Sequence, residues 1–335
     1  MDKSVFPSVL GVGNALVDII TILENDSVLE RFGLPRGSMT LVDSDLSKKI
    51  YDTVSSNKKE IATGGSVANS MRTFAGLGGE GGYMGKIGSD DLGRLFKNSF
   101  EKKGIKTHLS YSQNNTGRVM GLVSPDSERT MATYLGAAAE LTPNDFTHDL
   151  FAGYKYLYME GYLVFNHELI EAGVRMAKEA GLKIAIDLAS YNVVDANLEF
   201  LKNLIHNYVD IVFANEEEAK SFTGKEPEQA LEEIGKSCEL VIVKVGKEGS
   251  FIKRGEERLK VGIIPAKAID TTGAGDNYAA GFLFGLTRNL DLEACGKIAA
   301  IASGKVVEVM GPNLLDNQWP EVIEAVEKIV SGNSD

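Results

Sequence analysis

The feature that most constrains the fold is an alternation of short apolar runs and longer amphipathic runs in the second half of the chain. Runs rich in Val, Ile, Leu and Tyr read as buried parallel strands at residues 154–160, 183–188, 210–214 and 240–245. Amphipathic segments with helical spacing follow them, at residues 166–180, 198–208, 216–222 and 228–236. These repeated strand–helix–strand units predict an α/β fold, in which a mainly parallel sheet carries helices on both faces.

The rest of the C-terminal half extends this scheme. A hairpin is predicted at residues 249–254 and 257–264, a strand region ends near Ile269, and two long helices follow at about 274–287 and 292–309. Neither a repeat nor a low-complexity linker divides the 335 residues. We therefore expect a single domain that spans residues 1–335.

The first half is less regular and contains strand-like segments without helices between them. Residues 9–12 and 83–87 predict strands, and residues 65–77 and 92–103 predict helices. Hydrophobicity alternates as in half-buried strands, with no helix to cover them, at residues 18–23, 39–42, 118–123 and 130–135. Two insertions, at about 15–45 and 107–137, thus predict a small β-sheet lid over a site. The alternative is an edge extension of the main sheet.

The charge of the chain limits the ligands that it can bind. Its formal net charge is −12, so we expect no binding of nucleic acid or of an anionic membrane through the overall field. A phosphate-bearing ligand must then be held by a local feature of the site, such as a helix N-terminus or an arginine side chain.

The sequence also favours one cellular compartment. The apolar stretch 9–20 is too short and too polar for a membrane span, and residues 1–7 lack a signal-peptide layout. The chain has 2 cysteines, without metal-like spacing, which suits a reducing environment. We expect a cytoplasmic protein.

The strongest functional signal is the heptapeptide Asp-Thr-Thr-Gly-Ala-Gly-Asp at residues 270–276, which leads into an apolar helix. Its glycines remove side chains where the chain turns into the helix, so unpaired N–H groups and the helix dipole favour an anion there. Asp276 lies in the first turn, and a carboxylate beside an anion hole suits the deprotonation of an attacking hydroxyl. An ordinary N-capping aspartate after a glycine turn is the other interpretation.

Two familiar nucleotide-binding motifs are missing from the sequence. No Gly-x-x-x-x-Gly-Lys-Ser/Thr segment occurs, which excludes a Walker A loop. Gly11 and Gly13 begin like a dinucleotide-binding fingerprint, but Leu16 occupies the third glycine position. A dinucleotide-dependent oxidoreductase is therefore disfavoured.

Polar residues and glycines mark two turns in the first half. Asn14 and Asp18 follow the first strand, where ligands of open α/β folds bind, and a carboxylate there accepts two hydroxyls. Gly65 and Asn69 belong to a glycine turn that enters a helix, and its backbone can approach a ligand closely. Turn formation, solvation and helix capping by Ser66 are the alternatives to substrate binding.

Two later strand ends carry residues suited to a metal–nucleotide complex. Asn215 and Glu218 open a helix directly after a strand and are able to orient the waters that Mg²⁺ keeps in proteins. Acids in a first helical turn are also common for dipole reasons. Lys244, Gly246 and Gly249 end the next strand and suit a nucleotide lying across the loop, or simply a hairpin entry.

Together these segments resemble the ribokinase-like PfkB carbohydrate kinases, a family that includes adenosine kinases. The resemblance extends from Val9 to about Pro312, and its most specific part is the heptapeptide 270–276, which looks like the family's C-terminal signature. The family's N-terminal signature, N-x-x-E motif and G-x-x-G nucleotide loop are matched at residues 64–69, 215–218 and 246–249.

The resemblance implies a three-layer α/β/α fold with a mainly parallel central sheet and a small β-sheet lid. It implies ATP as the phosphoryl donor, Mg²⁺ as cofactor and Asp276 as the catalytic base. By position, it assigns the anion-hole amides to Gly273, Ala274 and Gly275, the acceptor hydroxyls to Asn14, Asp18, Gly65 and Asn69, the Mg²⁺ shell to Asn215 and Glu218, and the nucleotide to Lys244, Gly246 and Gly249. Many members also use a monovalent cation, and Asp270 and Thr272 fit one wall of a K⁺ site.

Within the family, residues 13–19, 64–70 and 129–139 look more like adenosine kinases than ribokinases. The resemblance then implies phosphoryl transfer to the 5′-hydroxyl of adenosine. Our own hypothesis is that Arg129 of the lid segment swings over the phosphates and neutralises their charge. Tyr134, Phe165 and Tyr191 are candidates for contacts with the base. A kinase of ribose, fructose or a similar sugar and a non-catalytic nucleotide-binding regulator are the alternatives. Both a monomer and a homodimer fit the sequence.

Overall fold

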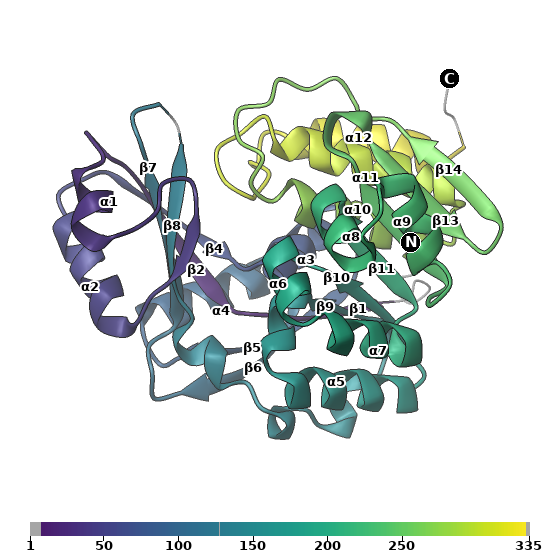
Figure 1. Ribbon diagram of the computed structural model, residues 1–335, viewed down its shortest axis with the longest axis horizontal. Coiled ribbons are helices and arrows are strands. Elements are labelled where there is room, and N and C mark those ends of the chain that lie inside the picture. Colours follow the sequence, from purple (N-terminus) through teal and green to yellow (C-terminus); the bar gives the residue numbers. More distant parts are fainter. Residues whose placement is uncertain (1–7, 127, 333–335) are drawn as a thin grey trace.

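The larger of two sheets forms the centre of the molecule (Figure 1). The computed structural model describes residues 8–126 and 128–332, so the segment 1–7, where no signal-peptide layout was found, lies outside the described residues. The strands of the central sheet, in spatial order, are β14 (Glu257–Val261), β13 (Ser250–Arg254), β12 (Leu240–Lys244), β11 (Ile211–Asn215), β10 (Lys183–Asp187), β9 (Tyr154–Glu160), β1 (Ser8–Val12), β5 (Gly81–Gly88) and β6 (Lys106–Ser112).

The pairing of these strands confirms the predicted α/β class. Every pair from β12 to β6 is parallel, whereas β13 and β14 form an antiparallel hairpin at one edge. Parallel neighbours place all their carboxyl ends at one edge of the sheet, which is where open α/β folds bind ligands. The predicted hairpin near residue 250 is therefore confirmed, with a shorter second strand.

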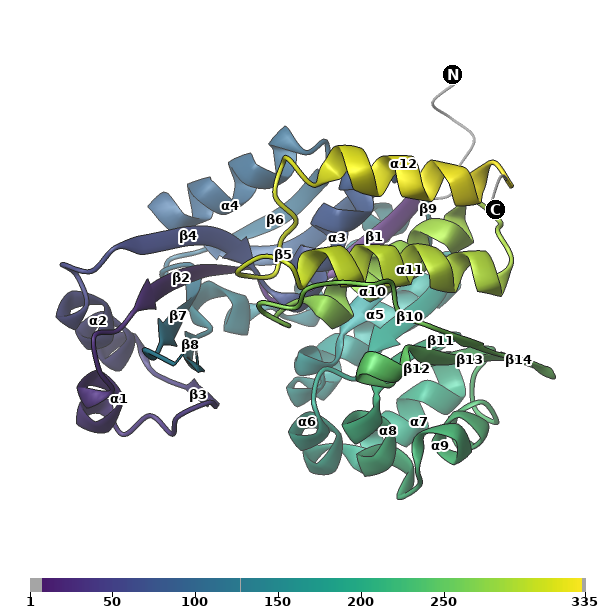
Figure 2. The same cartoon turned by 90° about the horizontal axis from the view of Figure 1, so that it is seen from above.

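Helices cover both faces of the central sheet (Figure 2). One face packs against α3 (Ser66–Gly76), α4 (Asp91–Lys102), α10 (Ala274–Thr287), α11 (Leu292–Val306) and α12 (Trp319–Val330). The other carries α5 (His167–Glu179), α6 (Tyr191–Ala196), α7 (Leu198–Tyr208), α8 (Glu216–Thr223) and α9 (Pro227–Ile234). Successive strand residues point to opposite faces: Leu157 and Met159 pack in one core and Tyr158 in the other.

The second sheet lies to one side of the first, at the left of Figure 1. Its strands, in spatial order, are β3 (Met39–Leu41), β8 (Arg129–Tyr134), β7 (Gly117–Val123), β2 (Leu16–Ile22) and β4 (Lys59–Gly64). The four strand-like segments of the first half all belong to this sheet. An edge extension of the main sheet is therefore excluded.

Three details of the small sheet differ from the expectation. Strand β4 is a fifth member, so the first inserted stretch runs to Gly64. Residues 107–112 belong to β6 of the central sheet, where backbone pairing with β5 holds them. Helices α1 (Ser27–Phe32) and α2 (Ser44–Thr53) cover the face that was expected to be bare, since Ile19, Met120 and Ala132 pack there with Ile50.

The segment before the heptapeptide also differs from the prediction. Residues 262–271, all of them described, form no strand, and the N–H of Ile269 instead donates to the Val307 carbonyl at 2.7 Å. Short 3₁₀ turns, η1 (Gly136–Glu140), η2 (Pro143–Asp145), η3 (His148–Phe151), η4 (Gly161–Phe165) and η5 (Gly246–Glu248), complete the described elements. None of the helices among residues 8–126 and 128–332 has both the length and the apolar character that a bilayer crossing requires.

Candidate active site

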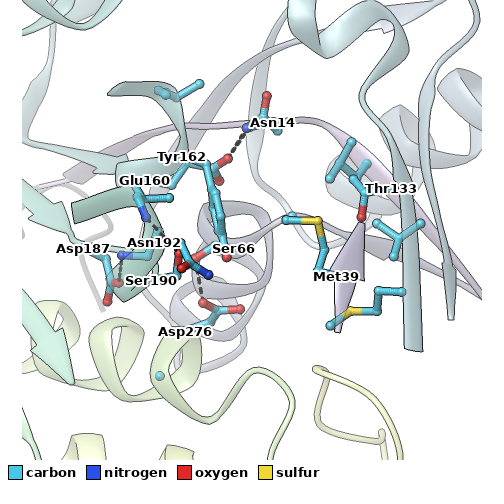
Figure 3. Close-up of a pocket in the computed structure, with 18 of the residues that line it drawn as sticks. Asn14, Met39, Ser66, Thr133, Glu160, Tyr162, Asp187, Ser190, Asn192 and Asp276 are labelled. Carbon is cyan, nitrogen blue, oxygen red and sulfur yellow. Dashed lines mark hydrogen bonds between the residues drawn. The ribbon is translucent and has the colours of Figure 1, made fainter. Parts of the chain in front are cut away.

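A cavity of about 1730 Å³ separates the small sheet from the carboxyl ends of the parallel strands. The strand ends contribute Glu160, Asp187, Asn215 and Lys244, and the start of α10 contributes Asp276. The opposite wall consists of β2, β3, β7 and β8 (Figure 3). The site residues expected from the sequence line this cavity, with the exceptions of Tyr134, Gly249, Asp270 and Ala274.

The heptapeptide forms the N-terminus of α10 in the way that its glycines predict. Gly273 is the N-cap with φ +75°, and a Cβ there would lie 2.6 Å from the Pro312 Cβ, so only glycine fits. Within the described chain, the N–H groups of Gly273, Gly275 and Asp276 donate no hydrogen bond. Three N–H groups at a helix N-terminus form an anion site.

Ala274 departs from the expected set of anion-hole amides. Its N–H donates to the Thr271 carbonyl at 3.1 Å as the turn closes, so it is not free for a ligand. Asn277, which the sequence did not single out, fixes the same turn. Its amide donates to the carbonyls of Gly273 and Pro312 at 2.8 and 2.9 Å.

The Asp276 carboxylate is held by two donors from α3 and caps no helix. Ser66 Oγ donates to Oδ1 at 2.7 Å (Figure 3), and Asn69 Nδ2 donates to Oδ2 at 2.9 Å. Burial raises the pKa of Asp276 to about 6, although these two donors lower it and Asp187 adds to the rise. The geometry thus favours a base over an N-capping aspartate. Ser66 was considered in the sequence only as a helix cap, a role that α3 does not show.

The residues expected to bind the acceptor lie close to Asp276. Asn69 Oδ1 is buried and has no hydrogen-bond partner among the described residues. Burial raises the pKa of Asp18 to about 7, against the opposing charge of Arg129. A Cβ on Gly64 would lie 2.3 Å from Asp18 Oδ1, so this glycine makes room for the carboxylate. An unpartnered acceptor and a carboxylate together suit a ligand that brings hydroxyl donors.

Glu160 is a functional candidate that the sequence reasoning missed. Its Oε1 accepts from the backbone N–H of Asn14 at 3.0 Å and from the Asn14 amide, while Oε2 accepts from the Val67 N–H at 3.2 Å. The side chain is 1% exposed, and burial raises its pKa to about 7. Glu160 thereby fixes the turn that carries Asn14 against the start of α3. Its position as the last residue of a predicted parallel strand was the signal that could have found it.

A second missed carboxylate, Asp187, ends strand β10. It accepts from Lys244 Nζ at 2.8 Å and from the N–H of Ala189, a non-glycine residue with φ +68°, at 3.0 Å. Burial of Lys244 works against its charge, but Asp187 and Glu218 outweigh that effect and raise the lysine pKa. Lys244 therefore stays protonated inside the cavity wall.

Asn215 and Glu218 form a reciprocal capping box at the start of α8. Asn215 Nδ2 donates to Glu218 Oε1 at 2.7 Å, and the Glu218 N–H donates to Asn215 Oδ1 at 2.8 Å. Burial raises the pKa of Glu218 to about 7, and neighbouring Asp187 adds to the rise. The motif therefore caps α8, and both of its residues also line the cavity.

Arg129 ties the small sheet to the heptapeptide. Its guanidinium donates to Asp270 Oδ2 and to Thr272 Oγ1, each at 2.8 Å, and both charged side chains are 13% exposed. Asp270 also accepts from the Gly311 N–H at 2.7 Å and from Thr272. This carboxylate is already saturated by donors and neutralised by a guanidinium. It does not fit the wall of a K⁺ site in this arrangement, and we assign no step to K⁺.

The two glycines after β12 have different roles. Gly246 has φ +53°, lines the cavity and has open space where a Cβ would stand. Gly249 lies outside the cavity, and a Cβ there would be 2.0 Å from the Val261 carbonyl oxygen. The hairpin therefore requires a glycine at position 249.

The candidate aromatic residues are only partly gathered at the cavity. Phe165 and Tyr191 line its mouth and are 63% and 47% exposed. Tyr134 lies elsewhere, with its ring 6.0 Å from the Arg118 guanidinium carbon. Tyr162 of η4, which the sequence did not suggest, lines the cavity beside Glu160 (Figure 3).

Comparison with known proteins places this site in a family. The pfkB family carbohydrate kinases match residues 40–319. The fold is similar to that of a probable sugar kinase from Rhizobium etli (35% identity, TM-score 0.86), with 97% of this chain and 98% of that chain covered. It is equally similar to an adenosine kinase from Sinorhizobium meliloti (37% identity, TM-score 0.85), with 96% and 99% covered.

A ribokinase from Lactococcus lactis is 30% identical over 267 residues, which cover 78% of this chain and 84% of that protein. These kinases are phosphotransferases that act on hydroxyl groups of sugars or nucleosides, and the family implies ATP as donor. The match over most of the chain confirms the resemblance and the ribokinase-like fold expected from the sequence. The chain therefore belongs to the PfkB family of carbohydrate kinases.

Proposed function

We propose that this chain transfers the γ-phosphoryl group of ATP to the 5′-hydroxyl of a nucleoside, most simply adenosine. The observation that carries the proposal is the Asp276 carboxylate, which two donors hold at the cavity wall beside three unpaired backbone N–H groups. A base next to an anion site meets the two chemical needs of phosphoryl transfer, namely an activated hydroxyl and stabilised negative charge.

The chemistry follows from the positions of these groups. The acceptor hydroxyls bind to Asp18, Asn14 and Asn69, with Asn69 Oδ1 supplying an acceptor that otherwise stays unpaired. The attacking hydroxyl gives its proton to Asp276 as its oxygen bonds to the γ-phosphorus. The N–H groups of Gly273, Gly275 and Asp276 stabilise the charge on the transferring group.

An apolar wall favours a nucleoside over a free sugar. Ile20, Met39, Leu41, Val119 and Met131 of the small sheet line the cavity, and Met39 and Leu41 are 43% and 59% exposed. A planar base covers such side chains and removes them from water, whereas a free sugar offers little apolar surface. The proposed acceptor therefore has a base at the lid and a ribose hydroxyl at Asp276.

A sugar kinase is the second candidate. The carboxylates of Asp18 and Asp276 both line the cavity, and carboxylates suit a ligand with many hydroxyl groups. Relatives named ribokinase and probable sugar kinase are as similar to the chain as those named adenosine kinase. The reaction at Asp276 is the same for either acceptor.

The residues at α8 fit a magnesium–nucleotide complex. Glu218 is a buried carboxylate beside Asp187, and burial and that neighbouring charge raise its pKa, so a nearby cation would stabilise its ionised form. Asn215 and Glu218 would hold the water shell of Mg²⁺, which often takes few protein ligands. When bound, the ion supplies charge neutralisation of the phosphates.

We propose that the small sheet acts as a lid. It forms one wall of the cavity, and the chain connects it to the rest of the molecule at several points around β2, β4, β7 and β8. Closure over a bound acceptor excludes water and so limits wasteful ATP hydrolysis.

An ADP-release assay with Mg·ATP tests the proposal across adenosine, other nucleosides and free sugars. We expect turnover on adenosine, and Asp276→Asn should lower kcat by roughly 10²–10⁴-fold because the general base is lost. Asp149→Asn, an exposed carboxylate on η3, is the matched control. Turnover on a sugar alone selects the second candidate. Near-normal turnover by Asp276→Asn contradicts its role as the base.

A further inference from the structure

The cavity wall carries an excess of negative charge. Asp18, Glu160, Asp187, Glu218 and Asp276 all line it, whereas Arg129 and Lys244 are the only lysine or arginine side chains among the described lining residues. A nucleoside triphosphate adds several negative charges to this space. Like charges at close range oppose binding and transfer, so a cation at the anion site has a large effect on the reaction.

The two cations are placed differently. Arg129 is on the lid strand β8 and pairs with Asp270, which lies outside the cavity. Lys244 is the last residue of β12, an interior strand of the central sheet. Its side chain is 15% exposed, and that of its partner Asp187 is 8% exposed. Lys244 therefore presents its charge from a fixed position, whether or not the lid moves.

The ammonium of Lys244 lies directly against the heptapeptide. A Cβ built on Gly275 would be 3.1 Å from Lys244 Nζ, so the ammonium lies against the backbone of Gly275, where a side chain would crowd it. The N–H of Gly275 is one of the three unpaired donors at the N-terminus of α10. A backbone donor and a side-chain cation thus converge on one point of the cavity.

We propose that Lys244 Nζ contacts the γ-phosphoryl group during transfer, and that Asp187 is a positioning residue that holds the ammonium at the anion site. This inference rests on the proposed function. In the step itself, the bond from the γ-phosphorus to the bridging oxygen breaks, and ADP leaves with that electron pair. A bond forms to the acceptor oxygen, whose proton goes to Asp276. Lys244 donates hydrogen bonds throughout and transfers no proton.

The strained turn after β10 supports the positioning role of Asp187. Ala189 has φ +68°, a conformation that costs an L-residue energy and that clusters at functional sites. Its N–H donates to Asp187 Oδ1, which leaves Oδ2 for Lys244. The competing explanation is that Lys244 only neutralises a buried carboxylate.

Three variants separate these explanations: Lys244→Met, Asp187→Asn and the double variant. We expect Lys244→Met to lower kcat by about 10²–10³-fold, the usual cost of losing one donor to the transition state, and Asp187→Asn to cause a smaller loss. The double variant should be as slow as Lys244→Met. If neutralising Asp187 were the only role of the lysine, the double variant would regain the activity of Asp187→Asn, and the proposal would be overturned.

Nucleotide binding supplies a second measurement that does not depend on turnover. By calorimetry, Lys244→Met should weaken ATP binding at least about tenfold more than ADP binding, because only ATP carries the γ-phosphoryl group. Lys253→Met is the matched control: this lysine is also buried, pairs with Glu232 at 3.3 Å and lies outside the cavity. Equal weakening of ATP and ADP would contradict the proposed contact. If the unmodified protein phosphorylates no acceptor, the proposed function fails, and the comparison of ATP with ADP still decides where Lys244 binds.

Discussion

The Asp276 carboxylate depends on two neighbours from a distant part of the chain. Burial alone favours its neutral form, which is useless to a general base. Ser66 and Asn69 each donate to one carboxylate oxygen and counter this effect, so the pKa of Asp276 settles at about 6. The Asp276 carboxylate is thus ionised at neutral pH because α3 lies beside α10.

Removal of one of these donors should move the pH dependence of the reaction. Asn69→Leu takes away a hydrogen bond that lowers the pKa of Asp276, so the pKa rises and the acidic limb of kcat/KM shifts to higher pH. A profile between about pH 5 and 9 measures this shift. Asn203→Leu, an exposed position on α7, is the control and should leave the profile unchanged. An unshifted profile for Asn69→Leu means that another group sets the acidic limb.

The sequence predicted site residues well where backbone geometry demands a residue type. The glycines and the aspartate of the heptapeptide are recognisable because only such residues form an open helix N-terminus with a carboxylate beside it. Glu160 and Asp187 were missed because their importance lies in the partners that tertiary packing brings to them. Ala274 was misjudged because one backbone hydrogen bond, to Thr271, depends on the detailed turn.

At the scale of elements, the strands were easier to predict than the helices that cover them. The lid strands alternate cleanly, since Ile19 faces the lid core while Asp18 and Ile20 face the cavity. Helix α1 has only 6 residues, too few for a clear helical period. Strand β4 was missed because it is an edge strand in which the neighbours Glu60 and Ile61 are both exposed, so its burial does not alternate.

The ion pair of Arg129 connects two elements that must move apart if the lid opens. Arg129→Met removes the contacts with Asp270 and Thr272, so β8 and β3 should exchange amide hydrogens at least about tenfold faster. Hydrogen exchange with mass spectrometry measures this rate. Arg36→Met is the matched control, because Arg36 pairs with Asp26 and Asp126 within the lid and is 45% exposed. Equal exchange in both variants would show that the ion pair does not restrain the lid.

At the scale of the whole molecule, the buried carboxylates make folding dependent on pH. The pKa values of Asp18, Glu160 and Glu218 are raised to about 7, and that of Asp276 to about 6. Between about pH 4 and 7, the folded chain therefore holds protons that the unfolded chain has lost. A raised carboxyl pKa contributes stability at low pH, and that contribution is lost as the pH rises through the folded value.

The chain without ligands should consequently melt at a higher temperature at about pH 5.5, which lies inside this window, than at about pH 8, which lies above it. Calorimetry at the two pH values measures the difference. Burial lowers the pKa of His108, which acts in the opposite sense but is a single group. Glu160→Gln should reduce the difference. A melting temperature that rises with pH would contradict the prediction.

The lid is built from two stretches of chain that are far apart in the sequence. Leu16 of β2 pairs with Gly117 of β7, and the chain between them builds β5, α3 and α4 of the larger part. Bringing such distant strands together costs loop-closure entropy. Formation of the larger sheet lowers this cost, because it fixes the ends of the two stretches of chain. We therefore expect the small sheet to be the last part to assemble during folding. A newly made chain would then acquire its acidic strand ends before the wall that encloses them, and kinase activity would appear only with the final folding phase.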